Sequence, residues 1–125
     1  GDGVGLLIKP EDTVFEIAQI ITELNAPIFL RPHPMMNDTK GWQELATQLD
    51  ITFSNPVSET PDTFLSNVGI IVGRVSGMHK EMLELGGEAL IISSDIISDN
   101  YNLSSYESSK FFKTWNGAIS YISSR

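Results

Sequence analysis

Short apolar runs alternate along this chain with segments whose apolar residues recur every three or four positions. Runs of this kind cover residues 28–31, 51–53, 69–73 and 89–92, and turn-forming residues separate them from their neighbours. Strands that are apolar throughout are typical of a parallel sheet covered on both faces. The further run at 4–8 is either a first strand or the tail of a linker, and the pattern leaves both open.

Helical spacing of apolar residues predicts helices between and after these runs, over 13–24, 41–49, 60–67, 78–85 and 109–121. Thr13 and Thr60 are expected to cap two of them, because a threonine hydroxyl accepts the free N–H groups of a first helical turn. Met78, Met82 and Leu85 are expected to form the packed face of the helix at 78–85.

Strands and helices therefore alternate along the chain, and the Ser- and Asn-rich stretch at 93–109 predicts a long loop before the last helix. Such alternation predicts an α/β domain with three layers: a mostly parallel sheet of about four or five strands, helices on both faces and a C-terminal helix. A chain of 125 residues suffices for one domain with a buried core, so we expect residues 1–125 to form a single domain.

The charge balance narrows the function classes. The chain has 8 basic and 16 acidic residues, and this net charge of −8 opposes a nucleic-acid-binding surface, which must neutralise phosphates. A small anionic ligand is not excluded, since backbone N–H groups and one or two local cations can hold a phosphate. With no cysteine and two histidines far apart in sequence, we expect no disulfide and no zinc centre. No apolar run approaches the ~20 residues of a membrane span.

The turn at 73–77, Gly-Arg-Val-Ser-Gly, joins a predicted strand to a predicted helix. Ligands of open α/β sheets bind outside the carboxyl ends of the strands, and a helix N-terminus offers free N–H groups to an anion. Arg74, Ser76 and Gly77 are therefore candidates for phosphate binding. The alternative is that Ser76 only caps the helix and the glycines only form the turn, and the sequence leaves both open.

Two prolines hold His33 just past the run at 28–31, on the same predicted edge as Ser76. Proline cannot donate to a strand ladder, so strand pairing must end there. Arg31 and His33 then supply a cation and a hydrogen-bond donor suited to a phosphate or diphosphate. The alternative is a loop histidine that bonds only to backbone. His79, inside a predicted helix, is expected to be structural or solvated.

Glu81 lies inside the helix that follows the Ser76 turn. A carboxylate there could accept both hydroxyls of a ribose. The simpler interpretation, favoured on the residues alone, is an exposed glutamate beside Lys80. Asp95 and Asp99 are interpreted as turn formers of the long loop.

Together, these segments resemble the C-terminal half of GT-B type glycosyltransferases, enzymes built from two facing Rossmann-like domains. In particular, they resemble bacterial capsule and surface-polysaccharide biosynthesis enzymes and the sialyltransferase-like group. The resemblance rests on Arg31–Pro32–His33–Pro34, and on the serine turn, helix and E-x-x-x-L-G run within GIIVGRVSGMHKEMLELGGEALII at 69–92. It covers about residues 28–95. The chain departs from many members of these families at two places. Its turn has one serine where many members have two, and Gly87–Glu88 stands where they have a K/P pair.

The resemblance implies that His33 contacts the phosphate of a nucleotide-sugar donor and stabilises this phosphate as it leaves. Ser76 and Gly77 would bind the same phosphate, and Glu81 would bind the ribose. No metal or cofactor is implied, because the nucleotide sugar is the substrate. The glycan acceptor and the general base would belong to an N-terminal domain absent from these residues, without which the fragment is expected to be inactive. The enzyme is expected in the cytoplasm or at the inner face of the membrane, with no stable span.

Three other functions fit part of the pattern. A UDP-sugar 2-epimerase-like enzyme shares the Ser–Gly turn and the ribose glutamate, but usually carries a longer S-G-G-x-x-E-E run. A non-catalytic flavodoxin-like or receiver-like regulatory domain would normally cluster aspartates at the first strand ends, where Asp2 and Asp12 are poor candidates. The third is a standalone subunit that pairs with a separate acceptor-binding chain.

Overall fold

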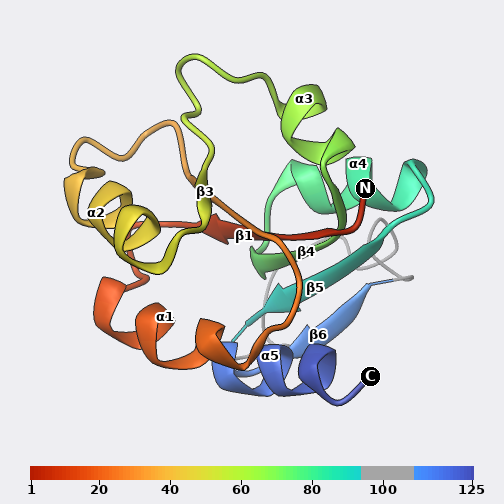
Figure 1. The fold of residues 1–125 in the computed structure, drawn as a ribbon. Coiled ribbons are helices and arrows are strands. Elements are labelled where there is room, and N and C mark those ends of the chain that lie inside the picture. Colours follow the sequence, from red (N-terminus) through yellow and green to blue (C-terminus); the bar gives the residue numbers. More distant parts are fainter. Residues whose placement is uncertain (94–108) are drawn as a thin grey trace.

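A computed structural model describes residues 1–93 and 109–125, and these residues form one sheet of six parallel strands in the order β3-β2-β1-β4-β5-β6 (Figure 1). The strands are β1 (Gly3–Ile8), β2 (Ile28–Pro32), β3 (Thr52–Phe53), β4 (Val68–Arg74), β5 (Glu88–Ile92) and β6 (Lys110–Phe112). The helices are α1 (Val14–Ile20), which continues as the 3₁₀ turn η1 (Ile21–Glu23), α2 (Lys40–Leu49), α3 (Pro61–Ser66), α4 (Gly77–Glu84) and α5 (Trp115–Ser123).

This strand order is that of the Rossmann fold. The chain builds outward from β1 to β3, then crosses to the other side of β1 and builds outward again from β4 to β6. The order reverses between β1 and β4, and ligands of such sheets bind in the crevice at this point. A flavodoxin-like or receiver-like domain has the order 2-1-3-4-5 instead, so the fold differs from that of the regulatory alternative.

Two apolar clusters hold helices on both faces of the sheet, which confirms the three-layer α/β class. One cluster joins the sheet to α1, α2 and α5 and includes Leu6 and Trp115. The other joins the opposite face to α3 and α4 and includes Leu7 and Phe64. Leu6 and Leu7 enter different clusters because successive side chains of a strand point to opposite faces.

The run at 4–8 is a strand, and it lies at the centre of the sheet. All six residues of β1 are buried, and β1 pairs with β2 on one side and β4 on the other. Leu6, for example, lies opposite Leu30 and Val72. Fully burying an aliphatic side chain of this size contributes about 1.5–3 kcal/mol relative to its exposure. β1 is therefore a core strand, and the linker interpretation is wrong.

Local signals place most helix ends correctly. The Thr13 hydroxyl accepts from the Glu16 N–H, and the Thr60 hydroxyl accepts from the Thr63 N–H, as predicted for N-caps. Gly86, with φ of 84°, reverses the chain after α4, a conformation that suits glycine. Leu85, the C-cap residue of α4, is 65% exposed, so the prediction that it belongs to the packed face of this helix is wrong.

The predicted helix over 109–121 is wrong in its first part. Residues 110–112 form β6, which pairs with β5 and adds a strand to the four or five expected. The helix begins only at Trp115, because the Thr114 hydroxyl caps it by accepting from the Gly117 N–H. Most of the predicted loop at 93–109, with Asp95 and Asp99, lies outside the described residues. In the described ranges, no helix has the length and apolar character needed to cross a membrane.

Candidate functional site

The residues that follow β1, β2 and β4 surround one small cavity at the carboxyl edge of the sheet. Lys9 follows β1, His33 follows β2, and Ser76 follows the end of β4. The cavity has a volume of about 40 Å³, and its wall also includes Leu7, Ile8, Arg31, Pro32, Pro34 and Met78. His33 and Ser76, distant in sequence, therefore share one cavity, as expected for residues at the carboxyl edge of one parallel sheet, although β1 lies between their strands.

Ser76 caps α4, as the sequence predicted for the residue before this helix. Its hydroxyl accepts a hydrogen bond of 3.0 Å from the Met78 N–H, and its carbonyl accepts one of 3.2 Å from the His79 N–H. Gly77 supplies the remaining N–H of the first helical turn, at the positive end of the helix dipole. Phosphate binding at this turn stays a prediction.

The packing of the fold requires only one of the two glycines of the turn. A Cβ at Gly73 would lie 2.6 Å from the Leu7 carbonyl oxygen, so the close approach of β1 and β4 requires glycine there. A Cβ at Gly77 would meet no atom within 4 Å. Since Gly77 has no positive φ, the fold itself does not require glycine at this helical position. A small residue here leaves the backbone N–H open to a ligand.

His33 is fixed by three backbone hydrogen bonds. Its N–H donates to the Ile8 carbonyl at 2.7 Å, and its carbonyl accepts from the Met36 N–H at 3.0 Å. The Nδ1 atom accepts from the Met35 N–H at 3.0 Å. A neutral imidazole whose Nδ1 accepts carries its proton on Nε2, so His33 presents Nε2–H as a donor. The two prolines thus accompany a rigid, oriented histidine.

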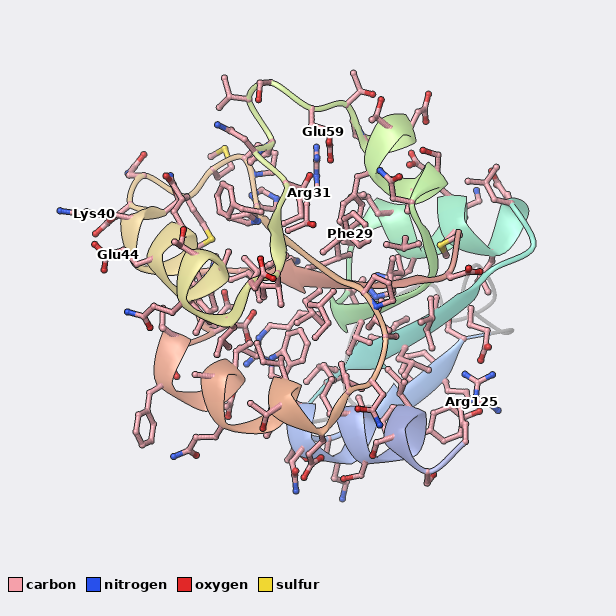
Figure 2. The ribbon with its side chains drawn as sticks, viewed as in Figure 1. Phe29, Arg31, Lys40, Glu44, Glu59 and Arg125 are labelled. Atoms are coloured by element: carbon pink, nitrogen blue, oxygen red, sulfur yellow. The ribbon has the colours of Figure 1, made fainter. Side chains whose placement is uncertain are left out.

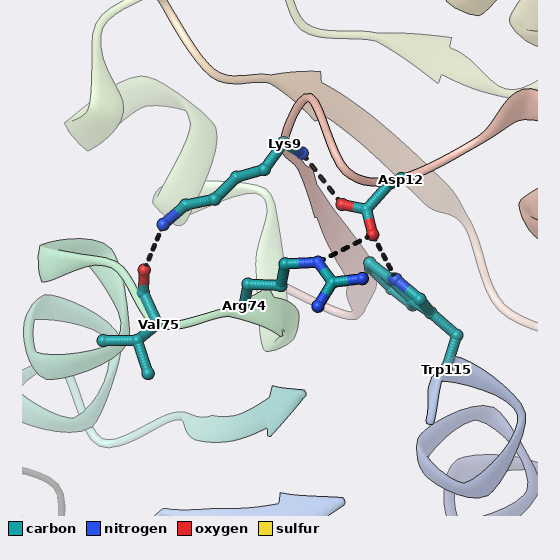
Figure 3. Close-up of polar contacts among 5 residues, drawn as sticks. All are labelled: Lys9, Asp12, Arg74, Val75 and Trp115. Atoms are coloured by element: carbon teal, nitrogen blue, oxygen red, sulfur yellow. Dashed lines mark hydrogen bonds and ion pairs between the residues drawn. The ribbon is translucent and has the colours of Figure 1, made fainter. Parts of the chain in front are cut away.

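Lys9 is a site residue that the sequence analysis did not single out. Its Nζ donates to the Val75 carbonyl at 2.5 Å, which brings the ammonium group next to the turn before α4 (Figure 3). An ammonium group has three N–H donors, and among the described residues only this one bond from Lys9 Nζ is formed. The sequence feature that could have identified Lys9 is its position directly after the run at 4–8. If that run is a strand, Lys9 lies at its carboxyl end.

Arg31 lines the cavity, but its guanidinium group is already engaged. Nη1 donates to the Ser54 hydroxyl at 2.9 Å, and the group lies 5.5 Å from the centre of the Phe64 ring. Figure 2 shows Glu59 beside Arg31 on the same side of the sheet. Burial lowers the pKa of Arg31 from its ordinary value, and the Glu59 charge partly opposes that shift. Arg31 is thus a buried member of a polar network.

Arg74 points to the opposite face of the sheet and does not line the cavity. Its Nε donates to Asp12 at 3.1 Å, and the same carboxylate accepts from the Trp115 Nε1–H at 2.8 Å and from the Lys9 N–H at 2.9 Å (Figure 3). The Asp12 side chain is completely buried, while that of Arg74 is 28% exposed. The structure therefore places Arg74 in an ion pair apart from His33 and Ser76.

The two remaining residues on α4 differ in exposure. Glu81 is exposed, as the simpler interpretation predicted, and does not line the cavity. His79 is fully buried, with Nδ1 3.3 Å from the Ser76 carbonyl oxygen and Nε2 3.1 Å from that of Leu90. Burial lowers the pKa of His79 to about 4, against the opposing effect of these carbonyls. His79 is thus a neutral structural residue.

The cavity is too small to enclose a nucleotide. Its 40 Å³ compares with about 10–15 Å³ of such space for one water and about 300 Å³ or more for a pocket that encloses a small ligand. A larger hollow of about 610 Å³ lies between α3 and α4, lined by Gly1 and Gly69, near the amino end of β4. That is the edge opposite to the one where ligands of this fold bind.

Comparison with known proteins adds no family to this geometry. No family model matches the chain, and no match is found among curated proteins. In the part of the chain that the structure describes, no group of three His, Asp or Glu side chains is arranged to hold a metal ion. The ligand of the site is therefore inferred from its own residues.

Proposed function

We propose that the chain is the donor-binding, C-terminal domain of a GT-B type glycosyltransferase that uses a nucleotide sugar in surface or capsular polysaccharide biosynthesis. The observation that carries the proposal is the shared cavity of His33 and Ser76, which adjoins the crevice where the strand order reverses. Nucleotides bind Rossmann-like sheets at this point, with a phosphate at a helix N-terminus.

The donor's phosphate would lie between His33 and the start of α4. There, the Gly77 N–H and the His33 Nε2–H donate hydrogen bonds, and the Lys9 ammonium supplies a positive charge. These groups stabilise the negative charge that develops on the phosphate as the glycosyl group leaves. Glu81, exposed on α4, would bind the ribose only if the nucleotide extends along that helix.

The remainder of the reaction requires a second domain. The cavity holds only a small group, so the base and the sugar would lie outside it and be covered from the opposite side. In the proposed enzyme an N-terminal domain, in the same chain or in a partner, supplies the general base and the glycan acceptor site. The nucleotide sugar is the substrate, and the reaction would take place on the cytoplasmic side of the membrane.

A nucleotide titration tests this function. The ¹⁵N-labelled protein is titrated separately with UMP, UDP, CMP, CDP and GDP. We expect at least one of these nucleotides to shift the amide signals of His33, Ser76 and Gly77. His33→Ala should weaken the binding of that nucleotide at least tenfold, or about 1.4 kcal/mol, because a preoriented donor to a charged group is lost. Gln43→Ala, an exposed change on α2, is the matched control and should leave the affinity unchanged. The absence of any shift near Ser76 at millimolar nucleotide contradicts the proposal.

A further inference from the structure

The hollow of about 610 Å³ between α3 and α4 lies at the amino edge of the sheet, near the start of β4. In Figure 1 the start of the chain lies beside both helices. The switch point, where the strand order reverses between β1 and β4, has its ligand crevice at the carboxyl edge instead. A nucleotide bound at the switch point would therefore leave this hollow open.

Apolar side chains form the floor of the hollow. Leu65 from α3, Val68 from β4 and Met82 from α4 line it, and each is at most 3% exposed. Leu85 also lines the hollow and, unlike the other three, is largely exposed. An exposed apolar side chain that continues an apolar floor is characteristic of a docking surface, because a partner can remove the whole patch from water.

Both helices end at this hollow, and their ends make it electronegative. Leu65 and Ser66 are the last residues of α3, and the wall residues 85–87 follow α4 directly. The C-terminus of a helix carries the negative end of its dipole, which a basic residue in the last turn commonly offsets. Neither α3 nor α4 has a basic residue there. The helices themselves therefore do not compensate this negative potential.

Carboxylates add to the negative potential. Asp62 lines the hollow, and Asp2 and Glu84 are the sequence neighbours of the wall residues Gly1 and Leu85. Among the described residues, no lysine, arginine or histidine side chain lines the hollow, and none of these three carboxylates forms an ion pair. The apolar floor thus has an acidic border.

Cations that begin β6 and follow α5 do not reach this border. Lys110 and Arg125 both lie about 5.6 Å from the centre of the Tyr121 ring, on α5. Arg125 also donates to Glu88 at 3.0 Å (Nη1) and 2.5 Å (Nη2). Because β5 side chains alternate and Ala89 packs on the α3 and α4 face, Glu88 and its arginine belong to the opposite face.

We propose that the hollow docks a basic segment of a partner protein, which places an apolar side chain against Leu85 and the floor, and a lysine or arginine beside Asp62. The apolar wall supplies affinity, and the uncompensated negative charge selects a basic segment over an acidic one. A second copy of this chain is a poorer match, because two chains of net charge −8 repel each other. The proposal goes beyond the proposed nucleotide function and does not depend on it, since the two sites lie at opposite edges of the sheet.

Short peptides of matched length test the docking site. The probes are acetylated, amidated pentapeptides that alternate leucine with arginine, leucine with glutamate, or serine with arginine. Titrated into the ¹⁵N-labelled full chain, the leucine–arginine peptide should shift the amide signals of Leu65, Leu85 and Gly86, with a dissociation constant of about 1 mM or below. The other two peptides should bind at least tenfold more weakly. Equal binding of either one, or shifts that bypass these residues, overturns the proposal.

Surface variants provide a second arm. Leu85→Ser should weaken the leucine–arginine peptide by about fivefold or more, and Asp62→Asn by about threefold. Val57→Ser, at another exposed apolar residue, and Glu44→Gln, at an exposed carboxylate on α2, are the matched controls and should change neither value (Figure 2). Binding that survives both site variants overturns the proposal. Leu85 and Gly86 signals that shift with protein concentration alone would make the hollow an interface between two copies, which also overturns it.

Discussion

The Trp115 Nε1–H donates a 2.8 Å hydrogen bond to Asp12 Oδ1, and this bond joins the start of α5 to the loop that follows β1. The same oxygen accepts from Arg74 at the end of β4. One buried carboxylate therefore connects three segments that are distant in sequence and adjacent to the switch point. In doing so it holds the β1 loop, which carries Lys9, beside the β4 turn, which carries Ser76.

Loss of the Asp12 carboxylate should destabilise the fold strongly. Asp12→Ala leaves the partly buried Arg74 without its counter-ion and the buried Trp115 N–H without an acceptor. We expect the free energy of unfolding to fall by about 3–5 kcal/mol, measured by urea denaturation. Glu11→Ala, an exposed acidic neighbour, should change it by no more than about 0.5 kcal/mol. Similar values for the two variants would mean that Asp12 is not the connection described.

The buried His79 should make the protein less stable in mild acid. Its pKa is about 4 in the folded state and about 6.5 when unfolded, so between these values the unfolded chain binds the extra proton. Stability therefore falls as pH decreases from about 6.5 to 4, by about 3 kcal/mol in total, and this contribution levels off below pH 4.

His79→Gln isolates that contribution. Urea unfolding at several pH values should show a shallower pH dependence for this variant than for the native protein between pH 4 and 6.5. Gln43→Ala, an exposed change at a residue that carries no titratable group, is the comparison and should retain the native slope. Parallel curves for the native protein and His79→Gln would show that His79 does not titrate in this window.

Substitutions of the two turn glycines should have opposite effects on stability, and Gly77→Ala should lower nucleotide affinity without destabilising the fold. Gly77→Ala adds a methyl group to open space in a helix, so stability should stay the same or rise by about 0.5–1 kcal/mol. The same methyl group stands where a phosphate would approach the backbone, so nucleotide affinity should fall at least tenfold.

Gly73→Ala should behave in the opposite way. Its methyl group would press on the Leu7 carbonyl, and we expect a loss of stability of about 1–3 kcal/mol. Thermal unfolding and calorimetric titration of both variants check the pair. Unchanged nucleotide affinity in a well-folded Gly77→Ala protein would mean that no ligand approaches this backbone.

Much of the candidate site could be predicted from local patterns. Prolines after a strand, and glycines around a serine at the start of a helix, act through their own backbone geometry, so His33 and Ser76 could be assigned to the carboxyl edge. The states of Arg31 and Arg74 could not be predicted. Their partners Glu59 and Asp12 lie 28 and 62 residues away, where no local pattern reports a contact.

The sequence by itself determined the α/β class, most helix and strand positions and the caps at Thr13 and Thr60, because these depend on hydrophobic period and on hydrogen bonds between near neighbours. Only the tertiary structure decided the strand order, the membership of β1 and β6 in the sheet, the burial of β1 and the direction of each cation. Those features arise from pairing between distant segments and from the face to which a strand's side chain points. Lys9 lines the cavity and Arg74 does not because pairing sets these two side chains on opposite faces of the sheet.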